Sequence, residues 1–214
     1  MKARAIAHPI QGLIKYHGLK DEIRRIPYHD SISVCVKELR TITTVEFDHR
    51  LSDDYIILNK NMVVGREKER VKIILNSLRK IAKASAHTRV VSENSLISGK
   101  GLGFSASGFA ALGLAASKAL DLDLDYISLS EIVRLGAGSA TRSLAGGFAL
   151  WYANKNGKSY AEQLAGPGDI DLKMIIVPIQ SDLKTDEAHR EVPASPLFQA
   201  RLQYINSILR EMRK

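Results

Sequence analysis

The sequence predicts an α+β fold, and three observations lead to this class. Runs in which β-branched and polar side chains alternate, as in half-buried strands, come early in the chain. Farther along, apolar residues recur at helical spacing while charged residues fill the opposite face of the same segment. The strand-like and helix-like segments do not alternate strictly, as they would in a chain of βαβ units, and this mixture favours α+β.

Seven segments are predicted to be strands, and two neighbouring ones show the clearest pattern. Residues 31–39 and 41–47 are expected to form paired, half-buried strands, because β-branched residues alternate with polar ones in both. The remaining strand-like runs are mostly shorter. They are residues 3–7, 55–58, 89–93, 148–153 and 172–179.

Four helices are predicted from periodicity and from end signals. Residues 66–84 form an amphipathic helix whose basic face, without interleaved aromatic residues, is expected to be solvated. Residues 109–120 are apolar on all sides, so this helix must be buried. Residues 128–131 fit a capping box that opens a third helix, which ends at residues 146–147. Residues 197–212 form a basic closing helix.

Composition and charge narrow the possible functions. The 214 residues are 45% hydrophobic and 25% charged, as in an ordinary globular protein. Thirty-one Lys and Arg residues against 23 Asp and Glu give a net charge of +8, which favours an anionic partner such as nucleic acid, an acidic membrane surface or a phosphorylated metabolite. The single cysteine, Cys35, cannot form an internal disulfide, and no signal peptide or membrane span is expected, so we expect a cytoplasmic protein.

The strongest local signal is a loop rich in glycine and serine at residues 99–108. Its four glycines allow backbone amides to approach an anion, and the helix that follows adds its partial positive charge. Ser105 and Ser107 can donate to phosphate oxygens or lie near Mg²⁺. The spacing is neither that of a P-loop nor that of a dinucleotide-binding loop, so a tight helix-packing turn is the alternative.

A second glycine-rich segment, residues 135–144, lies inside a predicted helix, where each glycine costs about 1 kcal/mol relative to alanine. Small residues at such positions indicate the close approach of a neighbouring backbone or of a ligand. Arg142 stands among Ser139, Thr141 and Ser143 and is suited to clamping a carboxylate or phosphate. The alternative is a closely packed helix with an exposed arginine.

A third segment, residues 9–18, places Lys15 beside aromatic and glycine residues. In this order the three segments resemble the decarboxylase branch of the GHMP kinase superfamily, which comprises the diphosphomevalonate decarboxylases and their archaeal phosphomevalonate relatives. Residues 14–18 are similar to the family's Ile-Lys-Tyr-Trp-Gly, and residues 101–111 are similar to its nucleotide-phosphate loop. Residues 136–148 are similar to its Gly-Ser-Gly-Ser-Ala-x-Arg-Ser-Leu-x-Gly-Gly-Phe segment.

The resemblance runs over essentially the whole chain and implies the GHMP N-terminal domain. This domain is a mixed sheet with helices packed on one face, built like a domain found in ribosomal proteins. Residues 1–180 would form the domain that binds substrate and ATP, and residues 181–214 would begin a truncated C-terminal domain. The family's catalytic aspartate is expected beyond Lys214, so a complementing C-terminal chain is one expected protein partner. Because family members are often dimers, the resemblance also implies a homodimer as the alternative.

The activity implied by the resemblance is ATP-dependent decarboxylation of phosphorylated mevalonate to isopentenyl phosphate or diphosphate, in isoprenoid biosynthesis, with ATP and Mg²⁺. The implied catalytic residues are Lys15, Ser139 and Arg142, and the implied substrate-binding residues are Tyr16, Ser139 and Arg142. Ser105 would also hold the Mg²⁺ ion. The implied ATP-binding residues are Gly101, Gly103, Ser105, Ala106, Ser107 and Gly108.

Alternatives remain open from the sequence. Phe104 stands where the family loop has the first of two serines, which would suit an ATP-independent decarboxylase of mevalonate 3,5-bisphosphate. An inactive fragment or one half of a split enzyme is a further alternative. RNA binding through the basic helices is the least favoured, and we expect no nucleic acid or membrane partner. Whether the substrate carries one or two phosphates at the 5-position is also left open.

Overall fold

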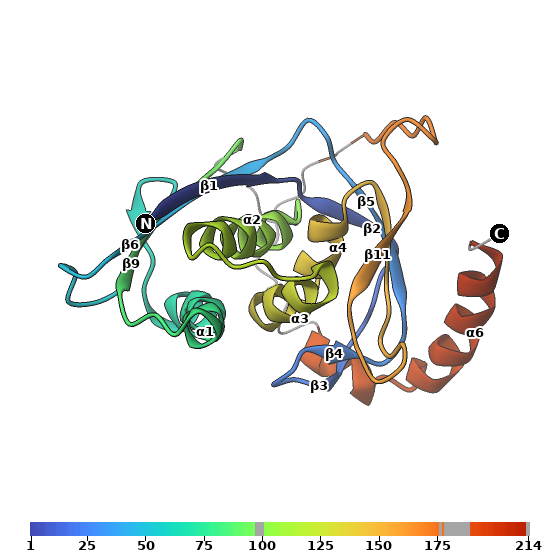
Figure 1. The fold of residues 1–214 in the computed structure, drawn as a ribbon. Coiled ribbons are helices and arrows are strands. Elements are labelled where there is room, and N and C mark those ends of the chain that lie inside the picture. The colour runs from blue at the N-terminus through green and yellow to red at the C-terminus, as the bar shows by residue number, and fades with distance from the viewer. Residues whose placement is uncertain (97–100, 176, 178–188, 213–214) are drawn as a thin grey trace.

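The computed structural model describes residues 1–96, 101–175, 177 and 189–212, and Figure 1 shows the chain as a ribbon. Two main sheets are joined by a central group of helices. The elements are β1 (Lys2–Ala7), β2 (Ile10–Ile14), β3 (Leu19–Asp21), β4 (Ile26–Pro27), β5 (Ser31–Cys35), β6 (Thr41–Asp48), β7 (Tyr55–Leu58), β8 (Asn61–Met62), α1 (Gly65–Ala82), β9 (His87–Asn94), α2 (Phe104–Ala119), α3 (Tyr126–Gly136), α4 (Ala140–Ala145), β10 (Phe148–Trp151), β11 (Ala161–Ala165), the short 3₁₀ helix η1 (Val192–Ala194) and α6 (Phe198–Glu211).

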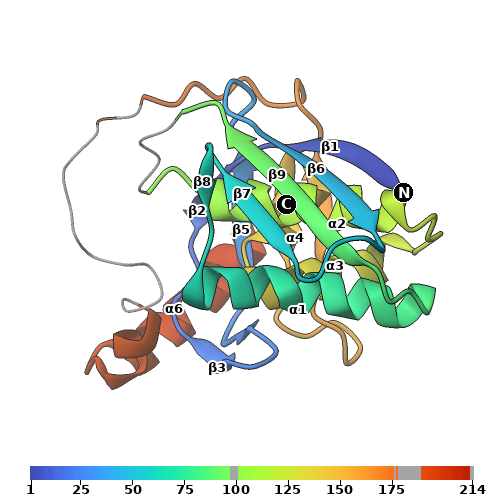
Figure 2. The same ribbon diagram turned by 90° about the vertical axis from the view of Figure 1, so that its left-hand side faces the viewer.

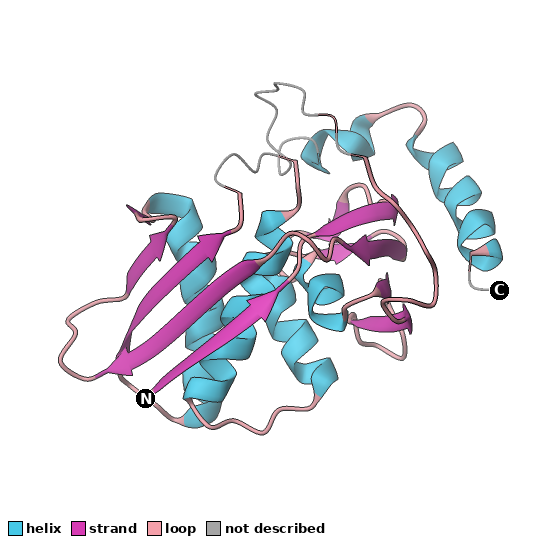
Figure 3. Cartoon of the chain, turned by 90° about the horizontal axis from the view of Figure 1, so that it is seen from above, coloured by secondary structure: helices cyan, strands magenta, loops and turns pink. Residues whose placement is uncertain are grey.

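The larger sheet has five strands in the order β1-β6-β9-β7-β8. It is mixed, because β7 runs parallel to β9 while the other neighbours are antiparallel. Along β6 every second residue is buried, as a strand with one covered face requires. Helices α1 and α2 cover that face, and Figures 2 and 3 show them together on one side of the sheet. The main apolar core lies between the sheet and these helices. It includes Val45, Phe47, Ile56, Ile74, Leu75, Leu78, Val90 and Leu112.

The smaller sheet has four antiparallel strands in the order β11-β10-β5-β2. Its two faces are covered by different helices, α4 on one side and α6 on the other (Figure 1). Successive residues of β10 point to opposite faces, as in any strand. Leu150 accordingly packs with Ile205 and Leu209 of α6, and Trp151 packs with Tyr16 on the α4 side.

The expectations for α+β class and for helices on one face of a mixed sheet are confirmed, whereas the predicted pairing of the early strands is wrong. The strand predicted at residues 31–39 ends at Cys35, and β5 and β6 belong to different sheets. The amide of Val36 still donates to the carbonyl of Pro9, just before β2, and the chain then passes to the larger sheet, where β6 begins at Thr41. Alternation of side chains shows that a segment is a strand but does not select its partner.

Two further strand predictions need correction. The described part of the strand predicted at residues 172–179, residues 172–175 and 177, is not in a strand, and the rest lies outside the described residues. Strand β2, the short β3–β4 pair and β11 were not predicted from the sequence. The predicted domain boundary at residue 180 falls in the stretch that the structure does not describe.

The helix predictions hold for α1 and α6 within two residues at each end, but not for the middle of the chain. Helix α2 begins at Phe104, five residues before the predicted start. Asp125, rather than Ser128, caps α3, because its carboxylate accepts from the Ser128 amide over 2.9 Å. The two glycines of the second segment lie at the break between two helices rather than inside one helix, because Gly136 is the last residue of α3 and Gly138 is in the connection to α4. Gly146 follows the end of α4. In the described part of the chain, none of the helices has the length and apolar character needed to cross a membrane.

Candidate functional site

A buried arginine forms the first part of the candidate site. Arg142, on α4, is 2% exposed and donates from Nη1 to the Ser31 hydroxyl over 2.6 Å. Its buried Nε has no hydrogen-bond partner, and no carboxylate pairs with it within the described part of the chain. Burial lowers the pKa of Arg142 to about 10, which leaves the side chain charged at neutral pH. A buried cation that lacks a carboxylate is a site for an anion.

Aromatic rings hold the Arg142 side chain in place. Its guanidinium carbon lies 5.5 Å from the ring centres of both Tyr16 and Trp151, within cation–π range. These two rings meet edge to face with centres 4.9 Å apart, and Tyr16 stacks on His189 at 4.5 Å. The rings come from three distant parts of the chain, so this arrangement exists only in the folded protein.

Two other buried polar atoms that have no hydrogen-bond partner among the described residues belong to segments next to Arg142. They are Oγ of Ser33, which shares a face of β5 with Ser31, and Nε2 of His29. The positive charge of Arg201 contributes to lowering the pKa values of both His17 and His29, although desolvation by burial is the larger cause for each. The region is thus rich in hydrogen-bonding groups and positive charge, as an anion-binding pocket requires.

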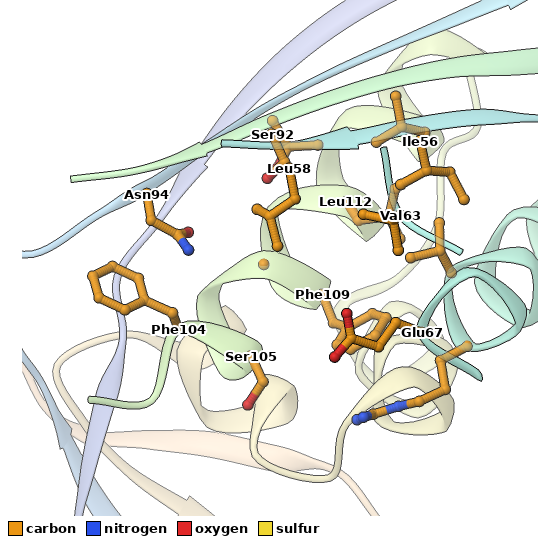
Figure 4. A pocket seen from close by; sticks show the side chains of 15 residues that line it. Ile56, Leu58, Val63, Glu67, Ser92, Asn94, Phe104, Ser105, Phe109 and Leu112 are labelled. Atoms are coloured by element: carbon orange, nitrogen blue, oxygen red, sulfur yellow. The ribbon is translucent and has the colours of Figure 1, made fainter. Parts of the chain in front are cut away.

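The second part of the site is a cavity of about 210 Å³ between α1, α2 and the five-stranded sheet. Figure 4 shows Ile56 and Leu58 of β7 facing Phe109 and Leu112 of α2 across it. Polar groups are few and lie at its edges. They are the side chains of Thr43, Glu67, Arg70, Ser92, Asn94 and Ser105. An apolar hollow with a few polar groups at its edges suits a flat aromatic ligand with a polar extension.

The start of α2 adjoins this cavity. Phe104 and Ser105, the first two residues of the helix, both line it (Figure 4). Gly103 has no side chain that could cap the helix, and the Ala106 amide donates to the Gly103 carbonyl over 2.9 Å. Among the described contacts, this leaves the amides of Phe104 and Ser105 for an anion. Gly103 has φ of 77°, and a Cβ there would lie 2.5 Å from the carbonyl oxygen of Ile10. The start of α2 is therefore packed directly against the beginning of β2.

Comparison with known protein families places the chain in one of them. Residues 7–161 match the family described as the diphosphomevalonate decarboxylase-like N-terminal domain. The chain belongs to this family.

Two proteins with similar sequences are named decarboxylases. The phosphomevalonate decarboxylase of Haloferax volcanii is 41% identical over 214 residues, which are 100% of this chain and 66% of that protein. The diphosphomevalonate decarboxylase of Saccharomyces cerevisiae is 33% identical, over 90% of this chain and 54% of the relative. The chain therefore spans between about half and two thirds of these relatives.

Solved decarboxylase structures share the fold. Mevalonate diphosphate decarboxylase from Staphylococcus aureus superposes with a TM-score of 0.83 at 32% identity, covering 99% of this chain and 66% of that one. A complex described as MDDEF with MVAPP, AMPPCP and magnesium has a TM-score of 0.83 at 31% identity, covering 98% of this chain and 66% of that one.

In this member of the family, two of the predicted substrate residues, Tyr16 and Arg142, lie in contact, with the ring of one beside the guanidinium of the other. Ser139 is half-buried at the N-cap of α4, three residues before Arg142, so both side chains lie on one side of the helix. The Lys15 side chain is exposed, while its carbonyl accepts from Nη2 of Arg201 over 3.2 Å. The structure thus brings all four predicted residues to one region.

The six residues predicted to bind ATP have different environments in this family member. Gly101 and Gly103 supply backbone conformations with positive φ, and Ser105 and Gly108 line the cavity. Ala106 and Ser107 are fully buried. The Ser107 hydroxyl is within 2.6 Å of the Thr41 hydroxyl and donates to the Phe104 carbonyl over 3.2 Å, so in this structure it supports the helix start rather than facing the cavity.

Sequence reasoning missed four residues of the site. Burial is the main cause that lowers the pKa of His29, and the charges of Arg201 and Arg142 add to it, so His29 lies near both arginines. The three residues are far apart in the chain, and nothing in the local sequence of His29 or Arg201 distinguished them. Arg70 belongs to the basic face of α1 that was expected to be solvated, yet it lines the cavity. Asn94 lines the cavity and directly follows the segment predicted as a strand at residues 89–93, but it stands among polar residues, so the sequence held no signal for it.

One group of side chains in the described residues has metal-ligand spacing, and it lies at the opposite end of β9 from the cavity. It consists of Asp53, Asp54 and His87. The buried Asp54 carboxylate already accepts from the Arg79 guanidinium and from the amide and hydroxyl of Thr88. These bonds account for Asp54 without a metal ion.

His29 gives the site a measurable pH dependence. Burial lowers its pKa below 6.5, so the unfolded chain binds more protons than the folded one as the pH falls below about 7. The contribution of His29 to the free energy of unfolding is fully present above pH 6.5 and is lost as the pH falls towards the pKa of His29 in the folded protein. We expect His29→Gln to reduce the drop in Tm between pH 7.5 and pH 5.0. Replacement of the exposed His49 by Gln is the control, and an unchanged drop for both variants would contradict the prediction.

Proposed function

We propose that this chain binds phosphorylated mevalonate and Mg-ATP and serves ATP-dependent decarboxylation to an isopentenyl phosphate or diphosphate. The observation that carries the proposal is the buried guanidinium of Arg142, which lacks a carboxylate partner in the described part of the chain. A fold must compensate for burying such a charge, and an anionic substrate supplies the missing partner. The family match and the named decarboxylases among its relatives support a phosphorylated mevalonate as this anion.

On the substrate side, Arg142 and Ser139 would hold the carboxylate or phosphate of phosphorylated mevalonate. Arg142 offers donors in a planar fork that matches the oxygens of either group, and its position is fixed by the rings of Tyr16 and Trp151. The exposed ammonium of Lys15 would contact the 5-phosphate at the open side of the site. Because these donors are already in place, little reorganisation is needed as negative charge develops.

On the nucleotide side, the apolar cavity would take the adenine ring, and the start of α2 would bind phosphate oxygens. Ser105 lies at the cavity edge and, as the second residue of α2, next to the free amides of the first turn. Gly101 and Gly103 give these amides their orientation. Phe104 forms part of the cavity wall without closing it, so the loss of a serine at this position is compatible with nucleotide binding.

The oxygen groups at the cavity edge suit magnesium. The Ser105 hydroxyl and the Glu67 carboxylate both lie there, and Mg²⁺ typically takes one or two protein oxygens together with phosphates and water. When bound, Mg-ATP supplies the phosphoryl group that makes the tertiary 3-oxygen of the substrate a leaving group. Decarboxylation then needs donors for the departing phosphate more than a general base, and Ser139 and Arg142 are such donors.

The proposal is tested with the 214-residue chain itself. Calorimetric titration with mevalonate 5-phosphate, mevalonate 5-diphosphate and Mg-AMPPCP measures binding, and release of CO₂ and ADP measures turnover. We expect one of the phosphorylated mevalonates and the nucleotide analogue to bind. Failure of both mevalonates to bind would refute the proposed substrate class.

Omission of ATP separates the ATP-dependent reaction from elimination of a phosphate already present on the substrate. Supply of mevalonate 3,5-bisphosphate without ATP is the matched assay. Release of CO₂ from the bisphosphate alone, with no nucleotide binding, would overturn the ATP-dependent assignment in favour of the ATP-independent one.

A further inference from the structure

Helix α1 contributes a side chain that binds the end of α3. Nε and Nη2 of Arg70 both donate to the carbonyl oxygen of Gly136, over 2.8 and 2.5 Å. Gly136 is the last residue of α3, so its carbonyl has no partner within the helix. A guanidinium is also favoured at the negative end of the helix dipole. Arg70 thereby fixes the point at which α3 ends.

The same arginine belongs to the wall of the apolar cavity. Its guanidinium carbon lies 5.0 Å from the centre of the Phe109 ring, and both side chains line the cavity. Phe109 packs so closely on α3 that a Cβ at Gly136 would lie 2.3 Å from Cδ1 of its ring. A ligand in the cavity that displaces Phe109 or Arg70 must therefore also act on Gly136.

Only three residues separate Gly136 from α4, which carries Arg142. Ala137 is extended, with φ of −153°, and a Cβ at Gly138 would lie 2.4 Å from the Trp151 ring. Ser139 then caps α4. So short and closely packed a connection leaves little room to absorb a shift, and a movement of Gly136 is passed on to Ser139 and Arg142.

We propose that Arg70 is a positioning residue that links the cavity to the anion-binding segment. By holding the Gly136 carbonyl from the cavity wall, it fixes Ser139 and Arg142 in the arrangement that binds an anion. Occupation of the cavity then changes the affinity for the anion, and the anion changes the affinity for the cavity ligand by the same factor. The proposal rests on the proposed function only for the identity of the two ligands.

Trp151 supplies the readout. It is the only tryptophan in the chain, it is fully buried, and its ring touches Gly138 and lies beside Arg142. Its fluorescence therefore reports the position of the segment between α3 and α4. The 214-residue chain is titrated with inorganic pyrophosphate as the anion probe, with and without saturating Mg-AMPPCP, in the wild type and in the variants Arg70→Met and Arg70→Lys.

For Arg70→Met we expect about tenfold weaker pyrophosphate binding, corresponding to loss of one charge-assisted hydrogen-bonded contact. We also expect loss of its dependence on Mg-AMPPCP and a shifted Trp151 emission without ligand. The affinity for Mg-AMPPCP alone should also fall, because Arg70 lines the cavity, but by clearly less than the affinity for pyrophosphate. A general loss of stability would weaken both ligands alike. Arg70→Lys keeps the charge without the fork and should be intermediate, and it carries the test if Arg70→Met folds poorly.

Lys80→Met removes a charge from an exposed position on the same helix and should behave as the wild type. Wild-type pyrophosphate binding that does not respond to Mg-AMPPCP would overturn the proposal, as would equal weakening of both ligands in Arg70→Met. A chain that binds pyrophosphate but neither phosphorylated mevalonate would refute the proposed function and leave the test of Arg70 intact.

Discussion

Replacement of Arg142 by methionine is expected to weaken the binding of phosphorylated mevalonate strongly while leaving the protein at least as stable as the wild type. The guanidinium is buried, and the described residues offer it no carboxylate. Truncating one member of a buried charged contact costs about 2–5 kcal/mol, so affinity should fall by about 30-fold to several thousandfold. Removing an uncompensated buried charge from the free protein has the opposite effect and stabilises it.

The measurements are calorimetric titration and thermal unfolding of the same preparations. Arg134 is the matched control, because it is also a buried arginine but donates to the Ser159 carbonyl over 2.6 Å and lies near Glu131. Arg134→Met should therefore lower Tm and leave anion binding unchanged. Stability lost in Arg142→Met, with ligand affinity retained, would show that Arg142 is structural and would remove the basis of the proposed site.

Alanine at Gly103 should have the largest effect on stability among the loop glycines. The residue has φ of 77°, and the added Cβ would lie 2.5 Å from the backbone oxygen of Ile10. The left-handed conformation and the displaced backbone together are expected to cost about 2–4 kcal/mol. Affinity for Mg-AMPPCP should fall at least about tenfold as well, since the first turn of α2 moves with this residue. Urea unfolding and fluorescence titration measure the two effects.

Gly101→Ala distinguishes the left-handed conformation from the backbone clash as causes of the lost stability. Gly101 has φ of 84°, and no atom of the described residues lies within 4 Å of the added Cβ, so we expect only the cost of the left-handed conformation, about 1–2 kcal/mol. If both variants lose the same stability, the contact between Gly103 and Ile10 contributes nothing, and β2 does not hold the start of α2.

The spacing of apolar residues was sufficient to predict those helices and strands in which one face is buried. Helices α1 and α6 and strands β1, β7 and β9 were predicted close to their observed bounds, because their buried residues repeat at the helical or strand period. The partner of a strand depends on the rest of the chain. Alternation in β5 and β6 is the same whether they pair with each other or, as observed, lie in different sheets.

The candidate site also contains residues that the local sequence singled out and residues that it did not. Arg142 and the glycine loop were found from the sequence because they sit in short segments with unusual composition. The start of α3 was misplaced, because Asp125 rather than the apparent capping box begins the helix. The break between α3 and α4 was missed, because the tight fit of Gly138 against Trp151 is a tertiary contact. His29, Arg201 and Arg70 gain their places only when distant elements pack together.

The two parts of the site rest on different sheets, and this division can be followed by hydrogen exchange. The cavity is lined by α1, α2, β6, β7 and β9 of the five-stranded layer, whereas Arg142 binds to β5 and packs on β10 of the four-stranded one. A ligand slows amide exchange most in the unit whose local opening it opposes. A nucleotide should thus protect the amides of β7 and β9, and a small anion those of β5 and β10, so that each ligand marks its own half of the molecule.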